Sequence, residues 1–176
     1  PTGNKYRIIC GFLRLQAIAE LGIRTVTARV ADRATDGGQL LLASLYDNLF
    51  HRQLNPIEKA GAVQRLAGFF PEEDVMRHYL PLLGLPPTAK ALHQYLTLAG
   101  ADAAVLEQLL QGRITERTAV ELAGMPQDES GIFIDLFSRI HLSASKQAEL
   151  IEYCADIMRR DDLGLRDVLR HADIIT

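Results

Sequence analysis

The 176-residue chain contains no tryptophan, and aromatic residues make up only 6% of it. The core must therefore be built mainly from leucine and alanine, which favour helix over strand. The two cysteines, Cys10 and Cys154, are too few and too widely separated for a disulfide framework or a Cys-x-x-Cys metal site. We interpret both as small buried apolar residues in a reducing compartment.

Long apolar runs and a large excess of charge are also missing. The sequence has no stretch of about 18 apolar residues that could span a membrane, and no signal peptide is visible. We therefore expect a cytoplasmic protein. The net charge of −3 argues against a protein that is held on nucleic acid by bulk charge alone. Any binding of nucleic acid must use a local patch.

The first 30 residues predict a compact β-α-β unit. Residues 5–10 and 25–30 contain β-branched side chains in the manner of strands. Residues 12–21 between them repeat leucine and alanine every four positions, which predicts a helix. Because a two-stranded sheet is marginally stable alone, we expect part of the sheet to lie upstream of Pro1.

Every later segment has helical periodicity. Asn55 as a cap, Pro56 at the first helical position and Glu58 at the third make a strong helix start. The predicted helices cover residues 39–49, 56–68, 71–83, 89–99, 103–110, 116–123, 132–140, 144–160 and 165–171. Thr115 and Ser143 are the expected caps of the helices that follow them. The expected fold class is mainly α, with a small α+β part at the N-terminus.

Two of these helices, at 71–83 and 89–99, are joined by a short connector that contains Gly84 and two prolines. This layout is typical of a helix-turn-helix, and also of an ordinary packed helix pair. In a helix-turn-helix the first residues of the second helix meet base edges. The candidates for base reading are Thr88, His93 and Gln94, and Lys90 is the candidate for a phosphate contact.

Three segments resemble the ParB family. Residues 11–17, Gly-Phe-Leu-Arg-Leu-Gln-Ala, resemble its Gly-Glu-Arg-Arg-x-Arg-Ala box. Residues 47–60 resemble its Glu-Asn-x-Gln-Arg box and the Leu-Asn-Pro-x-Glu-x-Ala continuation, of which Leu-Asn-Pro-Ile-Glu at 54–58 is quite specific. Residues 112–116 are similar to its Gly-Lys-Ile-Ser segment.

The resemblance implies a domain organisation and a partner. A ParB/sulfiredoxin-like α+β domain is expected at 1–53, a helix-turn-helix DNA-binding domain at 54–126 and a C-terminal helical extension at 127–176. The implied partner is double-stranded DNA, with Arg113 and Arg117 able to reach phosphates, and the implied assembly is a homodimer. The implied role is chromosome or plasmid partition, or transcription regulation, in association with the nucleoid or a plasmid.

The resemblance also implies binding of CTP with Mg²⁺, which many family members hydrolyse slowly. Gly11, Arg14 and Asn48 are the candidates for the nucleotide, because a glycine turn at a helix start presents backbone N–H groups to phosphates. Asp47 is the candidate for the metal, since its carboxylate is a preferred ligand of Mg²⁺. Apolar residues at 12, 13 and 50 stand where the family places charged or polar ones, so retention of the site stays open.

Some relatives are labelled nucleases, and a hydrolytic metal site would need convergent carboxylates or a His/Asp cluster. Asp47, His51 and Glu58 are the nearest candidates, but the spacing of Asp47 and His51 also fits an ordinary i,i+4 pair. We assign no catalytic residue and leave enzyme activity open.

An apolar stripe runs along the helix at 144–160 and comprises Leu150, Ile151, Cys154, Ile157 and Met158. It is expected to pack in the core, and the alternative is a dimer seam.

Three functions therefore remain open. The first is a sequence-specific DNA-binding module, and the second is a switch driven by CTP and Mg²⁺. The third is a helical interaction scaffold that has lost both activities. A basic patch around Lys90 and Arg117 would favour the first function over the third.

Overall fold

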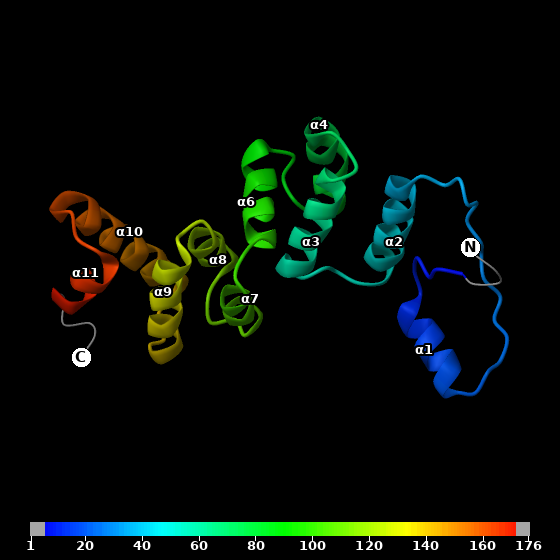
Figure 1. Ribbon diagram of the computed structural model, residues 1–176, viewed down its shortest axis with the longest axis horizontal. Coiled ribbons are helices and arrows are strands. Elements are labelled where there is room, and N and C mark those ends of the chain that lie inside the picture. Colours follow the sequence, from blue (N-terminus) through cyan, green and yellow to red (C-terminus); the bar gives the residue numbers. More distant parts are fainter. Residues whose placement is uncertain (1–5, 172–176) are drawn as a thin grey trace. The chain divides into compact units, whose positions relative to one another are not determined.

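The computed structural model describes residues 6–171, apart from the side chain of His171. Within these residues the chain is mainly helical and contains no β-strand (Figure 1), so the predicted mainly α fold class is confirmed. The chain divides into two compact units, residues 1–92 and 93–176. In the described part of the chain, no helix is both long and apolar enough to cross a membrane.

The first unit contains α1 (Phe12–Glu20), α2 (Gly37–His51), α3 (Pro56–Ala67), α4 (Glu72–Asp74), the π-helix η1 (Val75–Tyr79), α5 (Leu80–Leu82) and the start of α6 (Ala89–Ala99). The second unit contains the rest of α6, then α7 (Ala103–Leu110), α8 (Glu116–Ala123), α9 (Gln127–Arg139), α10 (Ala144–Asp161) and α11 (Leu165–His171). The three domains expected at 1–53, 54–126 and 127–176 remain a prediction.

The two predicted strands are wrong. Residues 6–10 and 25–30 form neither strand nor helix, and Lys5 lies outside the described residues. A strand is stabilised by hydrogen bonds to a neighbouring strand, and no described segment pairs with either stretch. All residues at 25–30 are exposed, including Val26 and Val30. The alternating pattern identified side chains suited to a sheet, but it could not supply the partner strand.

The predicted start of α3 is confirmed. The Oδ1 of Asn55 accepts the backbone N–H of Glu58 at 2.9 Å, and the Glu58 carboxylate accepts the backbone N–H of Asn55 at 3.0 Å. Pro56 occupies the first helical position, where its missing N–H costs nothing. The reciprocal bonds satisfy two backbone donors that would otherwise face solvent. Local sequence alone therefore determines where α3 begins.

Two helices begin earlier than predicted. Residues 36–38 look like a turn, yet the Asp36 carboxylate accepts the backbone N–H of Gly38 at 2.8 Å and so caps α2. Pro126 looks like a helix breaker, but it directly precedes α9, and Asp128 and Glu129 follow in the first turn. Acidic residues there complement the helix dipole.

The predicted helix at 71–83 is divided into α4, η1 and α5. Pro81 lies just after η1, lacks an N–H and has a ring that clashes with the carbonyl group four residues earlier. The preceding turn is widened into a π-helix, which relieves that clash. Val75 and Leu80 stay fully buried across the irregular stretch. The segment therefore keeps one apolar face in spite of the proline.

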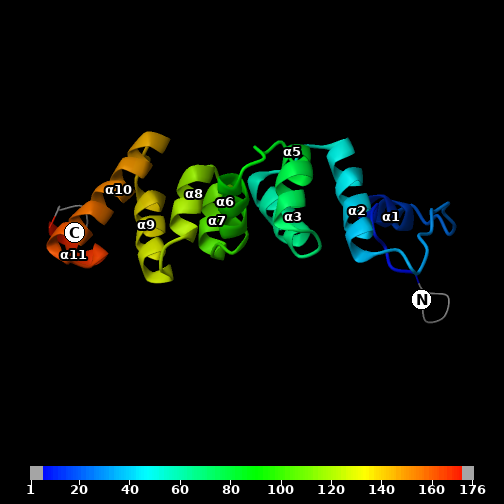
Figure 2. The ribbon, with the colours of Figure 1, turned by 90° about the horizontal axis from the view of Figure 1, so that it is seen from above.

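The first unit has its core where α3 packs against η1. Val63, Leu66, Val75 and Leu80 are all fully buried there. In Figures 1 and 2, α3 lies beside the segment that runs from α4 to α5. Helix α1 contributes no buried residue to this core.

The second unit has its core between α7, α8, α9, α10 and α11. Helix α7 packs against α8 and α9, and α10 packs against α8 and α11. The rings of Phe133 and Phe137 stack 5.9 Å apart in this core. Cys154 is buried, as predicted, and so is Ile151 of the same stripe. Cys10 is exposed, so its predicted burial is wrong, because no core forms around residues 6–10.

Candidate nucleic-acid interface

The interface candidate begins where the connector meets α6. The Oγ1 of Thr88 accepts the backbone N–H of Ala91 at 3.2 Å, which caps the first turn of the helix. Ala91 and Leu92 are buried, whereas Lys90 is exposed. The cap uses an acceptor site of the Thr88 hydroxyl and leaves its hydrogen free to donate. The start of α6 is therefore buried on one face, and its other face, called the open face, is exposed to solvent.

Lys90, His93 and Gln94 lie on the open face of α6. Their spacing of three and four residues places them on one side of the helix. Lys90 and His93 are exposed, and Gln94 is half-buried. Among the residues that the structure describes, Lys90 makes no ion pair. A free cation and an amide are thus presented together, as contacts to phosphates and bases require.

Lys59 on α3 is a cation that sequence reasoning missed. Its Nζ lies 3.9 Å from the position that a Cβ on Gly84 would occupy. Gly84 has φ +70°, a conformation that favours glycine, and it turns the chain toward α6. Lys59 therefore lies beside the connector within the first unit. No spacing rule links two residues 25 positions apart, so only the folded chain reveals this proximity.

Arg113 and Arg117 lie in the second unit, around the start of α8. Both side chains are exposed. The Nε of Arg117 donates to Glu121 at 3.0 Å, whereas Arg113 makes no ion pair within residues 6–171. The Oγ1 of Thr115 accepts the backbone N–H of Thr118 and caps α8, as predicted. Arg113 is therefore the more available of the two cations.

A buried polar network holds the loop that carries Arg113. Gln147 on α10 donates through Nε2 to the carbonyl groups of Arg113 at 2.7 Å and Leu142 at 3.2 Å. The Thr118 hydroxyl donates to the Oε1 of Gln147 at 3.1 Å. Gln147 and Thr118 are 3% and 1% exposed, so these bonds are shielded from water. The network ties the loop to α10, and sequence reasoning missed it.

The C-terminal half of α6 is fastened to α8. The buried Tyr95 hydroxyl donates to the Oε1 of Glu116 at 2.5 Å. Burial raises the pKa of Tyr95, and the hydrogen bond to Glu116 raises it further. Tyr95 therefore stays protonated and keeps donating, so the two helices remain linked.

Charge is distributed unevenly between the two units. Residues 1–92 contain 11 Lys and Arg against 8 Asp and Glu, a net charge of +3. Residues 93–176 contain 8 Lys and Arg against 14 Asp and Glu, a net charge of −6. Lys90 and Lys59 therefore belong to the basic unit, and Arg113 and Arg117 to the acidic one. A polyanion is attracted to the first unit and repelled by the second.

The candidate nucleotide residues form a small polar cluster. The Nη2 of Arg14 donates to both carboxylate oxygens of Asp47, at 2.9 and 3.0 Å. Gly11, at φ +80°, precedes α1, and a Cβ placed there would lie 3.4 Å from Arg14. The amide of Asn48 donates to the carbonyl group of Ser44 at 2.9 Å. The structure therefore brings Gly11, Arg14 and Asp47 together.

This cluster does not fit a triphosphate with its metal. Its cation, Arg14, is already paired with Asp47, the candidate metal ligand. Phe12 and Phe50 expose apolar rings nearby in the sequence. His51 lies 3.8 Å from Asp47, but Glu58 bonds Arg52 instead. Within residues 6–171 no three His, Cys, Asp or Glu side chains are grouped to hold a metal ion. Nucleotide binding stays a prediction.

Comparison with known proteins places these residues in context. No family model matches the chain. The chain is 27% identical over 132 residues to the probable chromosome-partitioning protein ParB of Campylobacter jejuni, a match that covers 75% of this chain and 45% of that protein. It is 28% identical over 156 residues to the probable chromosome-partitioning protein ParB of Coxiella burnetii, covering 87% and 51%. The chain thus spans about half the length of the curated relatives it matches. The resemblance to ParB that the sequence motifs predict is confirmed.

Proposed function

We propose that this divergent ParB-like chain is a DNA-binding module that acts in chromosome or plasmid partition. The observation that carries the proposal is the exposed Lys90 on α6, which makes no ion pair within the described part of the chain and shares a helix face with His93 and Gln94. The segment from α4 to α6 would act as the helix-turn-helix, with α6 in the major groove. The net charge of +3 on residues 1–92, which include Thr88 and Lys90, favours contact with a polyanion at the start of α6.

Each residue has a distinct part in the proposed contact. Gln94 can pair with adenine through its amide, and the Thr88 hydroxyl and His93 can reach other base edges. Lys90 would neutralise a phosphate, and Lys59 adds a second cation beside the connector.

Arg113 and Arg117 would add phosphate contacts from the second unit. Because Arg117 is 76% exposed, its pair with Glu121 is weak, and the guanidinium can exchange Glu121 for a phosphate.

A homodimer would place two such modules on a palindromic site. Ile151 and Cys154 of the α10 stripe are buried within the chain and pack in the core of the second unit. Leu150, Ile157 and Met158 of the same stripe are half-buried, so a dimer contact along α10 would use these residues. Association with the nucleoid or a plasmid would follow from DNA binding. Transcription regulation would use the same contact with DNA.

Selection from a pool of random duplexes tests the proposal. The immobilised chain should enrich a shared motif, and Gln94→Ala should change the enriched bases while Gln111→Ala, at an exposed glutamine of the second unit, should not. If repeated rounds enrich no shared motif, the chain does not bind DNA in a sequence-specific way.

The nucleotide switch and the interaction scaffold remain alternatives. Calorimetric titration of the chain with each of the four nucleoside triphosphates and Mg²⁺ tests the switch, which predicts heat with CTP that Arg14→Ala abolishes. If no nucleotide gives heat and no duplex binds, the scaffold is the function that remains.

A further inference from the structure

A surface groove lies in the second unit, and none of the proposed DNA-contact residues lines it. It is formed by the loop between α9 and α10 and by one side of α10, and it is open to solvent with a volume of about 670 Å³. Its lining residues are Ile140, Leu142, Lys146, Glu149, Leu150, Glu152, Tyr153 and Asp156. This volume is within the range of sites that hold several side chains of a ligand.

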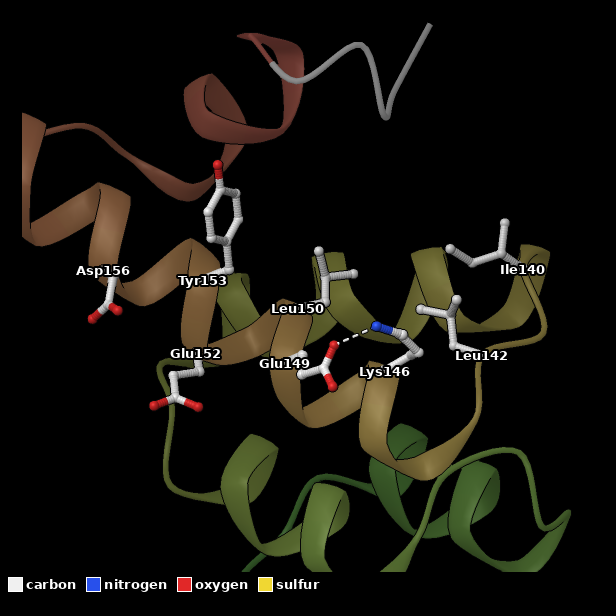
Figure 3. Close-up of a pocket in the computed structure, with 8 residues that line it drawn as sticks. All are labelled: Ile140, Leu142, Lys146, Glu149, Leu150, Glu152, Tyr153 and Asp156. Atoms are coloured by element: carbon white, nitrogen blue, oxygen red, sulfur yellow. Dashed lines mark hydrogen bonds and ion pairs between the residues drawn. The ribbon is translucent and has the colours of Figure 1, made fainter.

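The floor of the groove is apolar. Tyr153 and Ile140 are 61% and 38% exposed, and Leu142 and Leu150 are half-buried. Figure 3 shows these four side chains projecting to one side of α10. Apolar residues that gather in a concave surface, with a polar rim, are typical of an interaction site.

The rim of the groove is acidic. Figure 3 shows the carboxylates of Glu152 and Asp156 pointing away from the apolar side chains, on the flank of α10. Lys146 pairs with Glu149 at 2.6 Å and Arg159 pairs with Asp156 at 3.2 Å, but all four side chains are at least 60% exposed. Solvent-exposed ion pairs stabilise a protein only weakly, so a lysine or arginine of a bound partner can replace Lys146 or Arg159 beside these carboxylates. Glu152 makes no ion pair in the described part of the chain.

The net charge of the groove distinguishes two possible occupants, a second copy of the chain and a basic segment of another protein. The charged residues that line the groove sum to −2, with one lysine against three acids, and the unit as a whole has a net charge of −6. A second copy of the chain, docked by two-fold symmetry, would place two acidic grooves against each other, which is unfavourable. A basic segment avoids this repulsion and is attracted by the field of the unit.

We propose that this groove binds a basic amphipathic helix of a partner protein. The apolar anchors of that helix, spaced three and four residues apart, would lie on Tyr153 and Leu150. Its lysines or arginines would meet Glu152 and Asp156.

Two fluorescent peptides of identical leucine and lysine composition test the proposal. One has leucines at helical spacing, and the other has the same residues scrambled. In anisotropy titrations with the full chain, the amphipathic peptide should bind at least about tenfold more tightly than the scrambled one. Equal affinities would mean attraction by charge alone, which overturns the proposal.

Matched variants localise the binding. Glu152→Lys and Tyr153→Ala should each lower the affinity of the chain for the amphipathic peptide by about tenfold. Glu107→Lys and Leu110→Ala, on exposed positions of α7, should leave its affinity unchanged. Thermal melts monitored by circular dichroism establish that each variant is folded. If the control variants weaken binding equally, or if Tyr153→Ala only converts a dimer of the chain into monomers, the groove is not a peptide site.

Discussion

Lys90 occupies the second position of α6, between the exposed Ala89 and the buried Ala91 and Leu92. Its neighbours fix the backbone, while its own side chain extends into solvent. A lysine is a compact point charge with three donors, which suits a phosphate oxygen better than a base edge. The residue should therefore contribute affinity and little sequence preference.

Lys90→Ala should weaken binding to all duplexes by a similar factor and reduce the salt dependence of binding by about one phosphate contact. Anisotropy titrations at several salt concentrations measure both quantities. Lys146→Ala is the control, because Lys146 is an exposed lysine of the acidic unit that already pairs with Glu149 and lies outside the proposed DNA contact. A wild-type salt slope in Lys90→Ala would remove Lys90 from the interface.

Gln94→Ala should instead relax the preference for one base pair. Loss of a bidentate contact with a base costs about 1–3 kcal/mol of discrimination, whereas binding to unrelated duplexes is unaffected. Competition between the selected duplex and its single-base variants measures this discrimination. If all duplexes lose affinity equally, Gln94 supports the helix and does not read a base.

At the scale of the element, α3 illustrates how local bonds determine a helix start. Arg52 donates twice to the Glu58 carboxylate at 2.7 Å, and Asn55 donates its backbone N–H at 3.0 Å. These bonds favour the ionised form, so they lower the pKa of Glu58 below its ordinary 4.5, with the Arg52 hydrogen bond as the largest cause.

The lowered pKa gives a prediction with a definite sign. Glu58 stabilises the fold while it is ionised, so its contribution is complete above pH 4.5 and is lost as the pH falls through the folded-state pKa. Chemical denaturation of wild type and Glu58→Gln should give a difference in unfolding free energy that is constant near neutral pH and shrinks in acid. Arg52→Gln should move the loss to higher pH. A difference that does not change with pH would contradict the assigned bonds.

The loop before α8 depends on a more distant partner. Gln147→Leu removes the amide and leaves the Arg113 and Leu142 carbonyl groups without the donor they share, while the Thr118 hydroxyl keeps only its contact with the Thr115 hydroxyl. Buried groups left unsatisfied should lower the unfolding free energy by about 1–3 kcal/mol. Urea denaturation measures the unfolding free energy. The control substitution Gln111→Leu, at an exposed glutamine, should change that free energy by less than about 0.5 kcal/mol. Equal effects would mean that the network does not stabilise the loop.

These elements also explain what the sequence could predict. The helix starts at Asn55, Thr115 and Ser143 are confirmed, because a cap is satisfied within three residues. The strands at 5–10 and 25–30 are wrong because a strand depends on a distant partner. The contacts of Gln147 with Arg113 and of Lys59 with Gly84 join residues 25 or more positions apart. Periodicity describes one element at a time and cannot reveal them.

At the scale of the whole molecule, the two units differ most in charge. The net charge is +3 for residues 1–92 and −6 for residues 93–176, and the net charge of −3 for the whole chain does not reveal this difference. The acidic charge of residues 93–176 offsets the basic charge of residues 1–92, so nonspecific attraction to DNA is limited and binding depends on a few exposed cations. The same acidity attracts basic segments of proteins to the groove on α10.

The central claim is that the chain binds double-stranded DNA through the exposed face of the first half of α6, which carries Lys90, His93 and Gln94. Its most direct test is the affinity of the full chain for duplex DNA between about 50 and 200 mM salt. We predict that the logarithm of the binding constant falls linearly with the logarithm of the salt concentration, with a slope that corresponds to a few neutralised phosphates. Absence of salt-sensitive binding to any duplex, by a chain shown to be folded, would contradict it.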